Sequence, residues 1–209
     1  MSEPRVDISG LIYHVYNRAV GRAGIFAAVN DYRVLHHSIS SALHADPVTL
    51  HAYALMPNHW HLLVETHADG ALSKFVHRLS SIQARLWHEL NQTRGGGHLY
   101  QGPFKSSLIS NDAHFLNTAR YIERNPLVAS LVKRAEDWRW TSLCDRIHQT
   151  PFAGQLGSWP VDRPRNWLQL VNSTLPSDAL KSAPPSTGST WFRNEVELRL
   201  RALNQAKPG

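Results

Sequence analysis

Residues 48–65 read VTLHAYALMPNHWHLLVE, two runs rich in β-branched, aromatic and aliphatic residues on either side of Met56-Pro57-Asn58. Runs of this composition predict strands over 48–55 and 59–65. The proline and asparagine between them indicate a turn. Because the connection is so short, the two strands are expected to pair antiparallel. This hairpin is the predicted centre of the fold.

The segments around the hairpin add two more strands and several helices. Apolar spacing and helix-ending residues predict a strand over 11–18, a helix from Tyr32 to Leu43, a helix over 71–90, a strand over 99–109 bent at Gly102-Pro103, a helix from Asp112 to the Asn125-Pro126 break, and a short helix over 127–133. This order resembles an α+β, ferredoxin-like sandwich, in which one antiparallel sheet has helices packed on one face.

The composition changes after Trp138. Residues 151–190 hold many Pro, Ser and Gly, and five of the seven tryptophans lie from Trp138 onwards. We therefore predict a domain over residues 1–145 and a Pro/Ser-rich C-terminal extension over 146–209 that packs in pieces. A candidate final helix covers 191–204.

Charge and composition narrow the class of partner. The chain has 209 residues, 42% hydrophobic content and a formal net charge of +6, and its pI is about 9.8. A basic chain tends to bind nucleic acid or an anionic membrane, although it can also be merely soluble. The N-terminus lacks a signal peptide, and no stretch approaches the ~20 apolar residues that span a bilayer. Nucleic acid is therefore the favoured partner, with no membrane.

A single cysteine, Cys144, bears on the compartment and on metal binding. One cysteine excludes a disulfide within the chain and a cysteine-based zinc site. The sequence therefore fits the reducing cytoplasm, and a nucleic-acid partner there predicts association with the nucleoid.

His59-Trp60-His61 is the most informative tripeptide. Residues two apart in a strand face the same way, so both imidazoles would point to one side while Trp60 packs on the other. Two neutral imidazoles at this spacing can share one divalent metal ion. By itself, the pattern is more often a pair of half-exposed strand histidines.

Tyr121 and Asn125 form a second candidate pair. They are four residues apart in a predicted helix, so they lie one above the other on one helix face. The amide oxygen could complete a metal site, and the phenol could attack a phosphate beside that metal. The alternative is a core aromatic residue followed by a helix-capping asparagine.

Cations and aromatic residues near these motifs are candidates for DNA contacts. Phosphates need cations, and single-stranded bases need flat surfaces on which to stack. The predicted contacts are Arg18, Lys105, Arg120 and Arg124 for phosphates, and Tyr100 and Phe104 for bases. The alternative for each arginine is a solvated surface.

Taken together, several separated motifs resemble one family. They are Tyr13-His14-Val15 with Asn17-Arg18, then Leu55-Met56-Pro57-Asn58-His59-Trp60-His61-Leu62-Leu63, then His98-Leu99-Tyr100-Gln101-Gly102 with Lys105-Ser106, then Arg120-Tyr121-Ile122-Glu123-Arg124-Asn125-Pro126, and last Trp138-Arg139-Trp140-Thr141-Ser142. Their order and spacing resemble the REP-associated tyrosine transposases of bacteria. That group belongs to the single-strand insertion-sequence-type transposases of the His-hydrophobic-His (HUH) nuclease superfamily. The resemblance covers residues 10 to 145.

The resemblance implies a metal-dependent endonuclease and strand transferase that cuts single-stranded DNA near palindromic repeats. It implies that His59 and His61 bind Mg²⁺ or Mn²⁺, that Tyr121 is the nucleophile and that Asn125 is a third metal-side residue. Cleavage would leave a 5′-phosphotyrosine and a free 3′-hydroxyl. The expected partner is single-stranded or hairpin DNA, and the protein would act as a monomer or a homodimer.

The chain departs from the pattern at two positions. Ala19 stands where many relatives have Gly after the Asn-Arg pair, and Pro103 stands before Phe104 where many have Arg. Neither position belongs to the four candidate active-site residues.

Three other functions remain as alternatives. One is a DNA-binding module that kept the fold and lost the chemistry, which the presence of all four candidate residues disfavours. Another is a replication-initiator-like nicking enzyme of the same superfamily, which small size and the absence of a helicase-like phosphate loop disfavour. The third is an unrelated metal hydrolase that uses water, for which Tyr121 would be dispensable.

Overall fold

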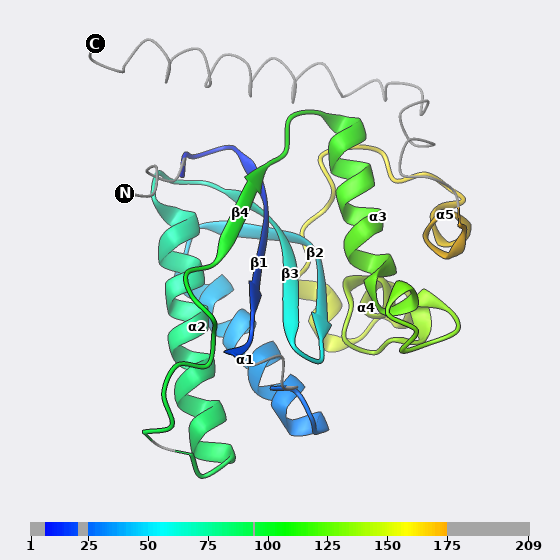
Figure 1. Ribbon diagram of the computed structural model, residues 1–209. Coiled ribbons are helices and arrows are strands. Elements are labelled where there is room, and N and C mark those ends of the chain that lie inside the picture. Colours follow the sequence, from blue (N-terminus) through cyan, green and yellow to red (C-terminus); the bar gives the residue numbers. More distant parts are fainter. Residues whose placement is uncertain (1–6, 21–24, 94, 175–209) are drawn as a thin grey trace.

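A four-stranded antiparallel sheet forms the centre of the computed structural model, which describes residues 7–20, 25–93 and 95–174. Its strands are β1 (Ile12–Arg18), β2 (Val48–Met56), β3 (His59–Thr66) and β4 (Lys105–Leu108). They are arranged in the order β2-β3-β1-β4, and every neighbouring pair is antiparallel (Figure 1). This is the ferredoxin-like order, so the predicted fold class and the predicted central hairpin are confirmed.

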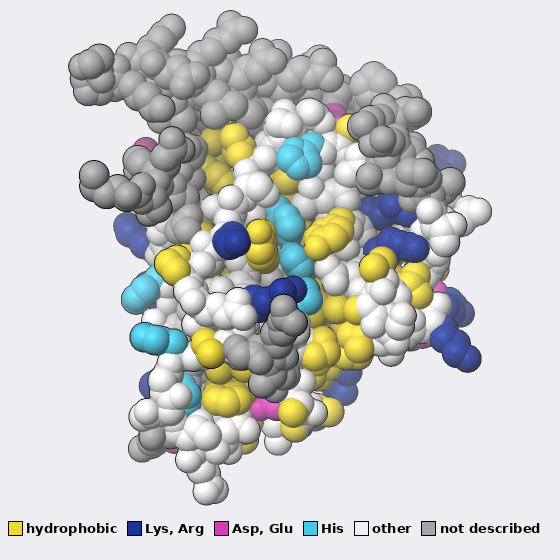
Figure 2. All heavy atoms as spheres, viewed as in Figure 1, with side chains coloured by type: hydrophobic (Ala, Val, Ile, Leu, Met, Phe, Trp, Pro, Cys, Tyr) yellow, Lys and Arg dark blue, Asp and Glu magenta, His cyan; other side chains and the backbone are white. Residues whose placement is uncertain are grey.

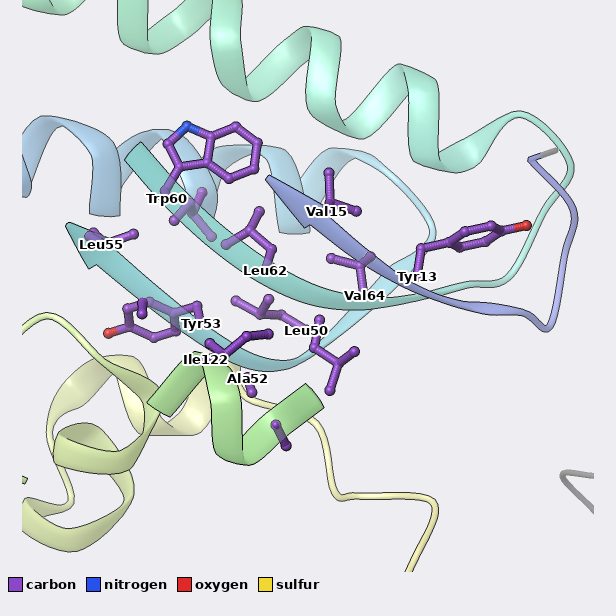
Figure 3. Close-up of a cluster of buried hydrophobic side chains, with 14 of the residues drawn as sticks. Tyr13, Val15, Leu50, Ala52, Tyr53, Leu55, Trp60, Leu62, Val64 and Ile122 are labelled. Atoms are coloured by element: carbon purple, nitrogen blue, oxygen red, sulfur yellow. The ribbon is translucent and has the colours of Figure 1, made fainter. Parts of the chain in front are cut away.

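Helices cover both faces of the sheet. The helices α1 (Val29–Ala45) and α2 (Ala71–Leu90) lie on one face, and α3 (Asp112–Val128) lies on the other (Figures 1 and 3). Trp60 and Leu62 of β3 point toward α1 and α2, whereas Ile122 of α3 packs below the sheet near Tyr53 (Figure 3). The expectation of helices on one face therefore holds for the two crossover helices and not for α3.

The end of α3 differs from the prediction. The helix continues through Asn125-Pro126 to Val128, and no separate helix forms over 127–133. A proline within a helix removes one main-chain hydrogen bond. Here Pro126 is buried, and the amide of Ala129 donates to the carbonyl of Asn125 at 2.9 Å, which closes the last turn. Packing therefore outweighs the tendency of a residue before proline to leave the helix.

The fourth strand is shorter than predicted. Only Lys105–Leu108 pairs as a strand, with β1, whereas Tyr100 makes an isolated bridge to Ala19. Gly102 and Pro103 lie between these two segments. Proline has no amide hydrogen to donate to a ladder, so the predicted bend breaks the strand.

The described part of the C-terminal extension packs back onto the sheet and α3. After α3 the chain forms a 3₁₀ turn at Ala135–Asp137, α4 (Ser142–His148), a second 3₁₀ turn at Pro151–Gln155 and α5 (Trp167–Asn172), and the last two of these lie within the extension. The predicted boundary between residues 145 and 146 falls inside α4. The predicted helix over 191–204 lies outside the described residues. Within the described ranges, no helix has the length and apolarity that crossing a membrane requires.

Candidate active site

A pocket of about 880 Å³ opens between β1, the segment before β4 and α3. It is lined by His14, Tyr16, Asn17, Arg18, His59, His61, Gln101, Gly102, Pro103, Lys105, Asn117, Thr118 and Tyr121. Figure 2 shows a row of histidine side chains across the middle of this face, with lysine or arginine side chains beside it. None of the described residues that line the pocket is acidic, so the pocket suits an anionic ligand.

Strand register explains why these side chains share one face of the sheet. Tyr16 of β1 lies directly opposite His61 of β3 and Lys105 of β4. Arg18 lies opposite His59. Because residues paired across an antiparallel ladder project to the same face and strand residues alternate, both histidines and both cations face the pocket. The predicted common orientation of the two histidines is therefore what the sheet produces.

Hydrogen bonds orient both histidine rings. Nδ1 of His59 lies 2.7 Å from Oδ1 of Asn58, the last residue of the hairpin turn. Nδ1 of His61 lies 2.9 Å from Nε2 of His14 on the neighbouring strand. Each ring therefore has its Nδ1 engaged, which leaves Nε2 as the nitrogen available to a ligand.

Burial keeps these rings neutral. Burial, with a smaller contribution from nearby Arg18, lowers the pKa of His59 to about 4. Burial also lowers the pKa of His14 to about 4 and that of His61 well below its ordinary value, with the neighbouring histidines adding to the effect at His61. A neutral imidazole has the lone pair that a metal ion needs.

Tyr121 reaches the histidines from α3. This helix packs on β2, where Ala52 and Ala54 are small and fully buried, and so comes close to the sheet. The ring centroid of Tyr121 lies 5.4 Å from that of His61 and 5.9 Å from that of His14. Tyr121 is nevertheless 53% exposed, so its phenol can reach a bound substrate.

Other residues predicted from the sequence lie elsewhere. Asn125 is half-buried and does not line the pocket. Arg120 is buried, and its guanidinium donates to the carbonyls of Leu170 and Ser173 at 2.7 and 2.9 Å. Arg124 donates to the carbonyl of Val171 at 2.6 Å. Both arginines thus bind the end of α5, outside the pocket.

The two aromatic residues predicted to stack on bases also lie outside the pocket lining. The Tyr100 hydroxyl accepts a hydrogen bond from Nε1 of Trp60 at 2.8 Å and donates to Gln83 on α2. Burial raises the pKa of this phenol. Phe104 is partly buried and packs against the core. Their positions favour packing over base stacking.

The pocket lining includes His14, Tyr16, Asn117 and Thr118, to which the sequence-based hypothesis gave no role. The first two could have been found, because His14, Tyr16 and Arg18 are spaced two apart in a strand. Asn117 lies four residues before Tyr121 and could have been found in the same way, by helical spacing. Their neighbours across the pocket depend on register and helix docking, which the sequence does not specify.

Among the described residues, no group of three or more His, Cys, Asp or Glu side chains is arranged to hold a metal ion. The His59–His61 pair nevertheless fits a divalent ion as a partial ligand set, because both rings are neutral and each presents Nε2. Imidazole nitrogens can bind first-row transition ions, whereas both Mg²⁺ and Mn²⁺ favour oxygen ligands. The remaining ligands would be oxygens of the pocket, of a phosphate or of water.

Comparison with known proteins shows the family to which this α+β chain, with its His–Tyr pocket, belongs. The model for the family "Transposase IS200 like" matches residues 7–125, so the chain belongs to the IS200-like transposase family. Membership of this family implies a transposase or nuclease enzyme. No curated protein matches the chain.

The solved structures that are similar to the chain include two transposases. One is a REP-associated tyrosine transposase bound to a REP hairpin, with a TM-score of 0.61 and 20% identity over 78% of this chain and 95% of that one. At this identity the likeness concerns the fold. The other, a candidate transposase from Deinococcus radiodurans, has a TM-score of 0.38 and 21% identity over 51% of this chain and 85% of that one.

Proposed function

We propose that this transposase-family protein is a metal-dependent endonuclease and strand transferase for single-stranded DNA, with Tyr121 as its nucleophile. The observation that supports this proposal most directly is the position of Tyr121. Its exposed phenol stands 5.4 Å, centroid to centroid, from the ring of His61 in a pocket that also holds Arg18 and Lys105.

The reaction conserves the energy of the phosphodiester bond. Oη of Tyr121 attacks the phosphorus, the Tyr121 Oη–P bond forms and the P–O3′ bond breaks. The phenolic proton leaves to solvent, and the 3′ oxygen takes one up, which gives a 5′-phosphotyrosine and a free 3′-hydroxyl. Because the product is still a phosphate ester, the hydroxyl of a second strand can reverse the step and join DNA.

Cations of the chain would hold the scissile phosphate. Arg18 and Lys105 are exposed at the pocket, with Arg18 two residues after Tyr16 on β1 and Lys105 opposite Tyr16 on β4. Mg²⁺ or Mn²⁺ held by His59 and His61 would polarise the P–O bond and offset the charge of the phosphate. Asn125 stays a proposed third metal-side residue, which requires its side chain to turn toward the pocket.

The substrate is proposed from the comparisons and the charge. The similar solved transposase is bound to a REP hairpin, and the pocket here is basic. We therefore propose DNA near palindromic repeats that fold as hairpins, acted on at the nucleoid in the cytoplasm. One chain brings Tyr121 and His61 together by itself, which supports a monomer over a homodimer that exchanges tyrosine helices.

Incubation with end-labelled single-stranded hairpin DNA and Mn²⁺ tests the proposal. We expect a protein–DNA band that survives denaturation with the wild type and with Tyr16→Phe, and none with Tyr121→Phe. His59→Ala should abolish cleavage while DNA affinity changes less than about threefold, because the ring binds metal and not phosphate. Cleavage without any covalent band, retained in Tyr121→Phe, would instead support a water-using hydrolase.

A further inference from the structure

His14 is the third histidine that lines the pocket, and it contacts His61. Its Nε2 lies 2.9 Å from Nδ1 of His61, and the two rings stack with centroids 5.1 Å apart and an angle of 28° between them. The register pairs His14 with Leu63, so His14 reaches His61 diagonally across the β1–β3 ladder.

In the hydrogen bond between His14 and His61, either ring nitrogen can be the donor. The contact made by His59 indicates which nitrogen donates. At His59 the partner of Nδ1 is an amide oxygen, which only accepts, so Nδ1 of His59 carries the proton and Nε2 carries the lone pair. His61 can present its own Nε2 to the same ion only if its Nδ1 is likewise protonated. That requires Nε2 of His14 to be the acceptor.

We propose that His14 is a positioning residue that accepts a hydrogen bond from Nδ1 of His61 and so fixes the tautomer and orientation of that ring for metal binding through Nε2. The inference rests on the proposed function, because it takes His59 and His61 as the metal ligands. A hydrogen bond to the second nitrogen of a ligating imidazole commonly sets its tautomer in this way.

Two features separate this role from direct ligation and from simple packing. The Nε2 atom of His14 is already engaged by His61, whereas the pair on β3 has both Nε2 atoms available. The rings of His14 and Tyr121 also make a T-shaped contact, with their centroids 5.9 Å apart. Packing alone would need only a flat ring at position 14, and the hydrogen bond needs an acceptor.

The matched variants are His14→Phe, which keeps a flat ring without an acceptor, and His14→Gln, whose amide oxygen can replace Nε2. His77→Phe, at an exposed position of α2, is the control for histidine loss. Binding of Mn²⁺ to the full chain is measured by electron paramagnetic resonance without DNA. The ¹⁵N shifts of His61 in metal-free protein at pH 7 report its tautomer.

We expect His14→Phe to weaken Mn²⁺ binding roughly 10- to 100-fold and to give His61 mixed tautomers. His14→Gln and His77→Phe should stay within about threefold of wild type, and His61 should keep the proton on Nδ1 in both. Wild-type affinity and tautomer in His14→Phe would overturn the proposal in favour of packing. Loss in His14→Gln equal to that in His59→Ala would overturn it in favour of direct ligation.

The arms of the experiment separate this inference from the function on which it rests. If His59→Ala binds Mn²⁺ as the wild type does, the metal site itself is wrong. If His59→Ala loses Mn²⁺ and His14→Phe does not, only the role of His14 is wrong. If His14→Phe fails to fold, the His14→Gln variant and the tautomer of His61 in the wild type still test the proposal. A wild-type His61 that is protonated on Nε2 would contradict it.

Discussion

Both faces of α3 carry polar side chains, which are exposed on one face and buried on the other. On the face toward the pocket, Tyr121 is 53% exposed. On the face toward α4 and α5, Arg120 is 7% exposed and Glu123 is fully buried. A charged residue next to the proposed nucleophile in sequence therefore need not contact substrate, because consecutive residues of a helix project in different directions.

The buried face fixes the position of the exposed one. Oε1 of Glu123 accepts from Ser142 at 2.8 Å, and Oε2 accepts from Nε1 of Trp167 at 2.7 Å. Arg120 donates to the carbonyls of Leu170 and Ser173 at the end of α5. These contacts hold the backbone that presents Tyr121 and so fix where its side chain enters the pocket.

The largest expected effect is on the pocket face. Tyr121→Phe should lower cleavage of hairpin DNA by more than about 1000-fold, because no other group supplies the covalent step. The melting temperature should stay within about 2 °C, because the lost hydroxyl belongs to an exposed side chain. Single-turnover cleavage and thermal unfolding, measured on the same preparation, check both statements. If cleavage and the melting temperature both fell, the result would contradict a purely catalytic role for the Tyr121 hydroxyl.

On the buried face, Glu123→Ala should lower the free energy of unfolding by about 3 kcal/mol, because it leaves Ser142 and Trp167 without their shared acceptor and opens a void. The melting temperature should fall by roughly 6–12 °C for a chain of this size. Below that temperature, the variant should still form the covalent adduct. Loss of adduct in fully folded Glu123→Ala would place this carboxyl in the chemistry.

Arg120, on the buried face of α3, and Arg18, in the pocket, should have opposite effects when replaced. Arg120→Ala should cost about 2 kcal/mol of stability, since partly buried carbonyls lose a charged donor, with DNA affinity unchanged. Arg18→Ala should leave stability unchanged and weaken DNA binding roughly 3- to 10-fold, with the salt dependence reduced by about one phosphate contact. Fluorescence anisotropy against salt concentration measures the slope. The reverse pattern would return Arg120 to its predicted DNA-binding role.

The smallest expected effect is a weak pH dependence of metal binding. Burial lowers the pKa of His59 to about 4, so the ring is neutral at pH 6, and falling pH protonates it only near pH 4. Affinity for Mn²⁺ should therefore fall less than about threefold between pH 7.5 and pH 6, whereas two histidines of ordinary pKa would lose roughly 15-fold. Calorimetric titration at the two pH values distinguishes these results.

The sequence predicted the features that depend on local pattern. Periodicity placed the central hairpin, and alternation placed His59 and His61 on one face. Other features are decided by packing: α3 passes through Pro126, and Arg120 and Arg124 turn toward α5. The neighbours of Tyr121 across the pocket, His14 and His61, come from different strands. Only strand register and helix docking bring them together.

Identification of the residue joined to DNA tests the central claim most directly. The wild-type adduct, formed with hairpin DNA and Mn²⁺, is digested with nuclease and trypsin and analysed by mass spectrometry. The account predicts phosphate and residual nucleotide on the peptide Tyr121–Arg124. Attachment to Tyr16, the other tyrosine of the pocket, would contradict it.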